Sequence, residues 1–226
     1  YVMEVADDID SGQLIVPVRY VPRNLAQELT RRGKLPIGEC VRLGAAIASA
    51  LGFLHRQDLL HRDIKPCNII FVNGFPKLAD IGLVSEISEP GLHIGTIGFI
   101  PPEGSGTARA DVYSLGKVLY EISTGRDRND YPELPKSLTD TAEDRDLVRF
   151  NKIVLQACRA DAGRRFKSAE ELLTAVVSFQ FSTYDSRKEK ARRRLLMLVS
   201  VGGVLIAAAF IALSIWRFIW LLKQER

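Results

Sequence analysis

The sequence predicts a mainly α-helical domain followed by one transmembrane helix. Residues 1–180 contain several segments with apolar residues at helical spacing, each next to a capping signal, and only one short hairpin pattern. Residues 195–216 are then 22 consecutive residues without a charge. A helix of that length spans about 33 Å, which is enough to cross a bilayer core of roughly 30 Å. The chain is 46% hydrophobic and 26% charged, which excludes a disordered protein.

The helices of the first 180 residues are defined by apolar stripes and by their ends. Asn24 and Ser168 are side-chain caps, and Glu171 completes a capping box with Ser168. Two short strands, near 69–72 and 76–79, flank an Asn73-Gly74 turn. The expected helices are a short one between Asn24 and Gly33, residues 37–56 with Val41, Ala45, Ala48 and Gly52 on one stripe, about 109–124 before Gly125, about 143–158, and one starting at Ser168.

The charge of the chain is concentrated at its end. The net charge is +4, but residues 187–226 carry +7, so that residues 1–186 carry −3. A mildly acidic folded part argues against binding of nucleic acid. The 3 cysteines and 3 histidines show no metal-ligand spacing, and the scattered cysteines indicate a reducing compartment.

The C-terminal segment has the charge pattern of a membrane anchor. Residues 181–194 form a basic juxtamembrane linker, 195–222 the transmembrane helix region and 223–226 a short tail. Six positive charges in residues 187–194 precede the span, so the positive-inside rule places residues 1–194 in the cytoplasm and makes this a single-pass protein. The alternative is a buried core helix, which seldom runs this long without a polar face. Gly203 and Ala207 are a small-x-x-x-small pair that leaves open a homodimer through helix pairing, but simple small residues in an apolar helix are the favoured interpretation.

Several short polar motifs occur at fixed distances from one another along residues 61–165. Each alone is a weak signal, but their order and spacing together match the protein kinase family, which residues 1–178 resemble. Among kinases they are most similar to bacterial membrane-anchored Ser/Thr kinases. The motifs are His61-Arg62-Asp63-Ile64-Lys65-Pro66-Cys67-Asn68, Asp80-Ile81-Gly82, Gly95-Thr96, Pro101-Pro102-Glu103, Asp111-Val112-Tyr113-Ser114-Leu115-Gly116, and the pair Asp161 and Arg165.

The resemblance implies a kinase-like C-terminal lobe over residues 9–180 and assigns catalytic roles within it. Asp63 is implied as the base or orienting group for the substrate hydroxyl, and Lys65 as a contact of the γ-phosphate. Asn68 and Asp80 supply the oxygen ligands that Mg²⁺ prefers, so that ATP and Mg²⁺ are the implied cofactors. The alternative for these residues is a polar turn that satisfies its own backbone.

Other motif residues are implied to position the site. Thr96 is expected to contact Asp63 and Lys65 and to help select Ser/Thr substrates. Arg62 either docks a phosphorylated activation loop or is a structural arginine, and the short loop after Asp80 favours the second.

The remaining motif residues are expected to be structural rather than catalytic. Glu103 and Arg165 are expected to form a buried ion pair. Asp111 is expected to accept backbone amides of the catalytic loop, and His61 is expected to be a core residue.

The first residues resemble the hinge between the lobes of a kinase, here residues 1–8. In that register Met3 is the gatekeeper, Glu4 and Ala6 contact the adenine edge through their backbone, and Ile70 packs beneath the ring. The N-lobe is then absent and lies upstream, because the chain has no G-x-G-x-x-G loop and no V-A-I-K lysine. We therefore expect this chain alone to be inactive, since transfer needs that lysine.

Three functions remain on the sequence alone. The first is a Ser/Thr protein kinase that transfers the γ-phosphate of ATP to protein hydroxyls at the cytoplasmic face of a membrane. The alternative is a membrane-tethered pseudokinase scaffold, which a missing upstream lysine would favour. A small-molecule kinase of related fold is the third, and the segment from Gly95 to Glu103 argues against it because it resembles a peptide-substrate platform. The sequence specifies neither the protein substrate nor the activating signal.

Overall fold

A computed structural model describes residues 21–80, 85–86 and 95–181 of the chain. The chain divides into two units, Tyr1–Gln180 and Phe181–Arg226. Except for Phe181, the second unit lies outside the described residues, and so do the expected hinge at 1–8, the basic linker from residue 182 onward and the expected transmembrane helix. The hinge, the basic linker and the transmembrane helix therefore remain predictions from the sequence.

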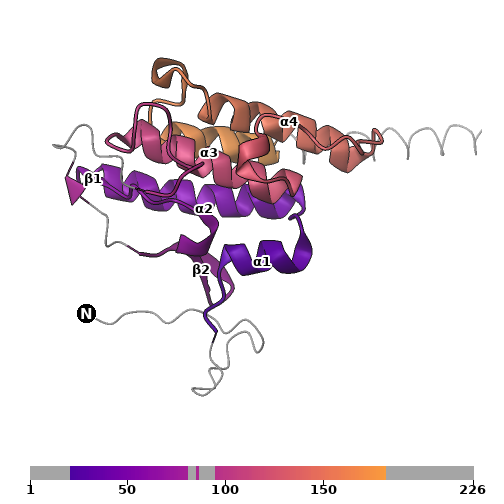
Figure 1. The fold of residues 1–226 in the computed structure, drawn as a ribbon, viewed down its shortest axis with the longest axis horizontal. Helices are drawn as coiled ribbons and strands as arrows, with labels where there is room; N and C mark the ends of the chain where they lie inside the picture. The colour runs from indigo at the N-terminus through magenta and orange to yellow at the C-terminus, as the bar shows by residue number, and fades with distance from the viewer. Residues whose placement is uncertain (1–20, 81–84, 87–94, 182–226) are drawn as a thin grey trace, which may run out of the picture. The chain divides into compact units, whose positions relative to one another are not determined.

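The described part of the first unit is mostly helical, as the sequence predicts, with two small antiparallel sheets (Figure 1). The helices are α1 (Leu25–Arg32), α2 (Ile37–His55), α3 (Ala108–Thr124), α4 (Ala142–Ala157), an unlabelled helix over residues 169–181, and the short 3-10 turns η1 (Pro66–Asn68), η3 (Arg128–Asp130) and η4 (Ala162–Arg164). The strands are β1 (Leu59–Leu60), which pairs with β4 (Ser85–Glu86), and β2 (Ile69–Val72), which pairs with β3 (Phe75–Leu78).

The β2–β3 hairpin differs from the prediction by one residue. The second strand was expected at 76–79 but starts at Phe75, directly opposite Val72. The loop is therefore only the two residues Asn73 and Gly74, with φ of 52° and 77°. Two positive φ angles are typical of the tight hairpin turn that matches the twist of its strands.

The predicted helix caps are confirmed at α1 and half confirmed at the last helix. The Asn24 side chain accepts from the Gln27 amide at 3.0 Å, while the Gln27 side chain accepts from the Asn24 amide. At the last helix the Glu171 amide donates to the Ser168 hydroxyl at 3.3 Å. The Glu171 carboxylate, however, accepts from the Lys167 amide and not from that of Ser168.

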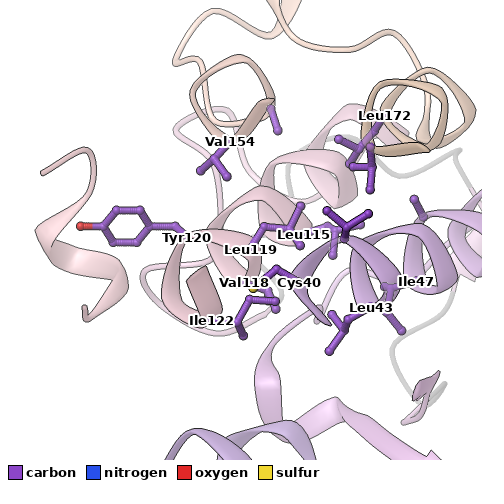
Figure 2. Close-up of a cluster of buried hydrophobic side chains, with 14 of the residues drawn as sticks. Cys40, Leu43, Ile47, Leu115, Val118, Leu119, Tyr120, Ile122, Val154 and Leu172 are labelled. Carbon is purple, nitrogen blue, oxygen red and sulfur yellow. The ribbon is translucent and has the colours of Figure 1, made fainter. Parts of the chain in front are cut away.

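The hydrophobic core lies where α2 and α3 cross, with α4 and the last helix above them. Figure 2 shows side chains of α2 facing those of α3, with Val154 of α4 and Leu172 of the last helix completing the cluster. Burying each large apolar side chain contributes about 1.5–3 kcal/mol. The buried residues of this contact are Cys40, Leu43 and Ile47 on α2 and Leu115, Val118, Leu119 and Ile122 on α3.

α2 is buried more widely than the predicted stripe. Val41, Ala48 and Gly52 are buried, Ala45 is only half-buried, and Cys40, Leu43 and Ile47 add a second buried row. Among the described residues α2 is the one helix long and apolar enough to cross a membrane. Its packing against α3 and α4 makes it a core helix of this unit, because apolar residues on several sides are what a central helix requires.

The close approach of α3 and α4 depends on Gly116. A Cβ at this position would lie 2.6 Å from Cys158 Sγ and 2.8 Å from Ala157 Cβ. We expect Gly116→Ala to lower the free energy of unfolding by about 1–3 kcal/mol, because an extra methyl group forces this contact apart. Urea denaturation followed by circular dichroism measures it.

Gly38→Ala in α2 is the matched control. The added Cβ would meet only the flexible Arg42 side chain at 3.8 Å, so this variant should be neutral or slightly stabilising. Equal stability of the two variants would contradict the proposed role of Gly116.

Candidate active site

Asp111, in the first turn of α3, holds the loop that follows β1. Its side chain is buried, and its two carboxylate oxygens each accept a backbone amide, from His61 and from Arg62, at 2.9 Å. These are the amide contacts expected from the sequence. Arg62 has φ of 66°, so the loop turns sharply at the residue before Asp63. The His55 ring, at the end of α2, also lies 2.9 Å from Asp111 Oδ2, a contact that the sequence reading missed.

The His61 side chain links the loop to the end of β3. Its Nε2 lies 3.1 Å from the Ala79 carbonyl oxygen and its Nδ1 accepts from the Asp63 amide at 3.4 Å. The first contact requires a proton on Nε2 and the second a lone pair on Nδ1, which fixes one neutral tautomer. Both ring nitrogens are therefore occupied by backbone groups, in agreement with a structural role.

The Asp63 carboxylate is the centre of a polar cluster. Thr96 donates its hydroxyl to Oδ1 at 2.8 Å, and Asn68 Nδ2 donates to Oδ2 at 3.0 Å and to the Asp63 carbonyl at 2.8 Å. The ammonium of Lys65 lies 2.7 Å from Oδ2 and donates to the Thr96 hydroxyl at 2.8 Å. Four residues that are up to 33 positions apart thus meet around one carboxylate.

This cluster sets the charge state of the site. Burial by itself would raise the pKa of Asp63, but the hydrogen bonds from Lys65 and Thr96 and the charge of Lys65 outweigh it, and the pKa lies below the ordinary value. Burial would likewise lower the pKa of Lys65, and the contacts with Asp63 raise it instead. Near neutral pH the two groups form an ion pair, with Asp63 as carboxylate and Lys65 as ammonium.

Asn68 and Asp80 offer oxygen atoms suited to a magnesium ion. The Nδ2 of Asn68 is committed to Asp63, and its Oδ1 has only the weak thiol contact of Cys67 at 3.6 Å. Asp80 is exposed and follows Ala79, whose amide donates to the Asn68 carbonyl at 2.8 Å, so the two residues are held on adjoining backbone. Within the described residues no cluster of three His, Cys, Asp or Glu side chains could hold a metal by itself.

Glu103 and Arg165 form the ion pair expected from the sequence, but only Arg165 is buried and Glu103 is exposed. Arg165 Nη2 lies 2.8 Å from Glu103 Oε2, and Nη1 contacts Oε1. The guanidinium also lies 4.8 Å from the centre of the Tyr113 ring. Its other acceptors are the carbonyl oxygens of Arg159, Ala160 and Arg109, at 2.6, 3.1 and 3.3 Å.

Of the adenine contacts expected from the sequence, the structure describes only Ile70. Met3, Glu4 and Ala6 lie outside the described residues. Ile70 is half-buried in β2, paired with Lys77 and bridged to Asn24 ahead of α1. This places it on the hairpin next to the catalytic loop, which is compatible with the expected role.

Comparison with known proteins gives a consistent result. Residues 3–179 match the family model of the protein kinase domain. Serine/threonine-protein kinases PknA of Corynebacterium glutamicum is 33% identical over 178 residues, which cover 68% of this chain and 36% of that protein. Serine/threonine-protein kinases drp72 of Corynebacterium efficiens is 32% identical over 199 residues, covering 76% and 37%. Serine/threonine-protein kinase PknL of Mycobacterium tuberculosis is 38% identical over 111 residues, covering 45% and 28%. The aligned part of this chain thus spans little more than a third of the first two relatives.

Removing Arg165 should destabilise the fold far more than removing an exposed arginine beside it. The Arg165 side chain is 0% exposed and that of Glu103 is 33% exposed. We expect Arg165→Ala to cost about 3–5 kcal/mol of unfolding free energy, since it removes a buried side chain and leaves three carbonyls without their donor. Glu103→Gln should cost about 1–3 kcal/mol, because Arg165 keeps its carbonyl acceptors.

Arg164→Ala is the control, since its ion pair with Asp161 is solvent-exposed. It should change the free energy by less than about 1 kcal/mol in the same urea titration. A loss for Arg165→Ala no larger than that of the control would show that the contacts of Arg165 do not stabilise the fold.

Proposed function

Because this chain belongs to the protein kinase family, we propose that the protein that carries it transfers the γ-phosphate of ATP to serine or threonine hydroxyls of proteins. The observation that carries this proposal is the Asp63 carboxylate held by Lys65, Asn68 and Thr96. Such a cluster places a fixed negative charge where a substrate hydroxyl can donate to it. Phosphoryl transfer depends mostly on this kind of positioning and on charge neutralisation.

The charge state of Asp63 indicates how it acts on the substrate hydroxyl. A carboxylate whose pKa lies below its ordinary value is a weak base, so it cannot remove the proton of an alcohol before the reaction begins. It can accept a hydrogen bond from the hydroxyl and fix its oxygen in line with the phosphate. The proton then passes to Asp63 as the new O–P bond forms and the hydroxyl becomes acidic. Asp63 is thus foremost an orienting group.

Lys65, together with a Mg²⁺ held by Asn68 and Asp80, would neutralise the negative charge of the ATP phosphates. The ammonium of Lys65 lies on the same side of Asp63 as Thr96, from where it can contact the transferred γ-phosphate. Asn68 and Asp80 would hold Mg²⁺, which when bound neutralises the charge of the ATP phosphates. Met3, Glu4, Ala6 and Ile70 remain our proposed contacts of the adenine.

The relatives and the Thr96 contacts support serine/threonine over other acceptors. Each of the three relatives reported above carries the name of a serine/threonine-protein kinase. The Thr96 hydroxyl contacts both Asp63 and Lys65, so the Thr96 side chain limits the space left for a substrate side chain beside the Asp63 carboxylate. A pseudokinase scaffold is less well supported, since loss of catalysis would relax the selection for Asp63, Lys65, Asn68 and Asp80 together.

We propose that ATP binding also needs a glycine-rich loop and a strand lysine, which the 226 residues do not contain. The chain alone is therefore expected to transfer no phosphate, whereas the full-length protein is expected to do so.

We also propose that residues 195–216 tether the protein to a membrane with the kinase domain on the cytoplasmic side. The support is the uncharged run of 22 residues and the six positive charges that precede it. Protein substrates at the same membrane surface would be the natural targets.

Replacing the orienting carboxylate tests the proposed activity. In the full-length protein we expect Asp63→Asn to lower the rate of transfer to a protein or peptide substrate by about 10²–10⁴-fold, because the amide cannot accept the proton. Transfer of radiolabelled phosphate from ATP measures it, with small-molecule alcohols as competing acceptors. Asp58→Asn, at an exposed position of the same chain, is the control and should retain the activity.

Three outcomes of that assay would contradict the proposal. A wild-type protein that binds ATP without transferring phosphate would favour the scaffold. Transfer to small-molecule alcohols in preference to peptides would favour a small-molecule kinase. Full activity of Asp63→Asn would remove Asp63 from the mechanism.

Membrane attachment is tested by fractionation of cells that express the full-length protein. The protein should sediment with membranes, resist extraction by high salt and dissolve in detergent. A version that ends at Arg194 should be released by salt, since its basic segment gives only screened electrostatic attraction. Salt extraction of the intact protein would show that residues 195–216 do not span the bilayer.

A further inference from the structure

A tight turn over residues 96–99 carries the hydroxyl that contacts Asp63. The Phe99 amide donates to the Thr96 carbonyl at 3.1 Å and closes the turn. Thr96 faces Asp63 and Lys65, whereas Ile97 is 87% exposed. Only the Phe99 side chain of this turn is buried. The position of the Thr96 hydroxyl therefore depends on what holds the backbone of the turn.

Arg128, in the turn η3, lies across this backbone. Its Nε donates to the Ile97 carbonyl at 3.3 Å, and its guanidinium carbon lies 4.7 Å from the centre of the Phe99 ring. A Cβ at Gly98 would lie 2.7 Å from the same Nε, and Gly98 has φ of +90°. The Arg128 side chain thus packs directly against Gly98, and this contact leaves no room for a side chain at position 98.

Arg128 is in turn held by two buried charged residues of α3. The Glu121 carboxylate accepts from the Arg128 amide at 3.1 Å and from Nη1 at 3.2 Å. The Lys117 ammonium donates to the Arg128 carbonyl at 2.6 Å. Both α3 side chains are buried, so these contacts are shielded from water and fix the backbone and side chain of Arg128 together.

We propose that Arg128 is a positioning residue: it clamps the turn over residues 96–99 onto α3 and thereby holds the Thr96 hydroxyl against Asp63. This rests on the proposed kinase function. The described contacts form a continuous path, from Lys117 and Glu121 through Arg128 to Ile97 and Phe99, and from Thr96 to the carboxylate. Arg128 itself does not touch the reacting atoms.

The alternative is that Arg128 only stabilises the fold, as Arg149 does elsewhere. Arg149 makes the same two kinds of contact: it lies 5.4 Å from the Phe179 ring centre and 3.7 Å from Asp146. These contacts join α4 to the last helix and lead to no residue of the candidate site. Arg149→Ala is therefore a matched control for the loss of a stacked, ion-paired arginine.

The test compares these variants in the full-length protein, with a peptide substrate and ATP. We expect Arg128→Ala to lower kcat by roughly 10- to 100-fold, because small displacements of a positioned group cost that much. The KM for ATP should stay within about twofold, since no ATP contact is removed. Arg128→Lys should recover only part of the rate, as a lysine keeps the charge but lacks the planar face and the fork of donors. Arg149→Ala should keep the wild-type kcat.

A double-mutant cycle with Thr96→Ala shows whether Arg128 acts through Thr96. If it does, adding Arg128→Ala to Thr96→Ala lowers kcat no further, because the group that Arg128 positions is already gone. Multiplying effects in the double variant would overturn the proposal, as would a kcat for Arg128→Ala equal to that of Arg149→Ala. Absence of any transfer by the wild-type protein would instead refute the proposed function on which this inference rests.

Discussion

The site depends on one buried carboxylate, Asp111 at the start of α3. A buried charge is unfavourable unless it is fully bonded, and here the two oxygens accept the amides of His61 and Arg62 and contact the His55 ring. The positive end of the α3 dipole stabilises the same charge. The loop must therefore adopt the sharp turn at Arg62, and that turn places the buried Asp63 beside Asn68 and Thr96. Without Asp111 the loop amides would have no such acceptor.

The same helix supports the other parts of the site. The Ser114 hydroxyl donates to the Phe99 carbonyl at 2.8 Å. Glu121 and Lys117 bind Arg128 and thereby hold the turn η3. Gly116, on the same helix, permits the close approach of α4. Each of these contacts starts from a position of α3 that is buried. The charged ones among them are costly to bury, so their retention is better explained by the geometry that they impose than by the stability that they add.

The sequence was sufficient to locate the residues that we propose as catalytic and the main helices. Asp63, Lys65, Asn68 and Asp80 could be proposed because the expected roles demand particular groups at particular spacings, and the helix from Asn24 to Gly33 could be predicted because its caps are local. Contacts that depend on how distant segments pack could not be found. The bond of His55 to Asp111 and the clamp of Arg128 on Ile97 join residues 56 and 31 positions apart, and neither residue stands in a recognisable motif. The one-residue shift of β3 has a different cause, since the turn geometry decides the register.

Stability and catalysis share one framework in this fold, and this limits how the site can vary. A change at Asp63 affects its contacts with Lys65, Asn68 and Thr96, but it leaves the loop backbone held by Asp111. A change on α3 reaches further, because the helix orients the loop through Asp111, the turn over residues 96–99 through Ser114 and Arg128, and α4 through Gly116. Replacing a residue that we propose to act on substrate should therefore disturb less of the fold than replacing a residue that positions it. A scaffold that had lost catalysis could keep α3 unchanged while Asp63 drifted, and finding both sets of residues intact in one chain is what favours an enzyme.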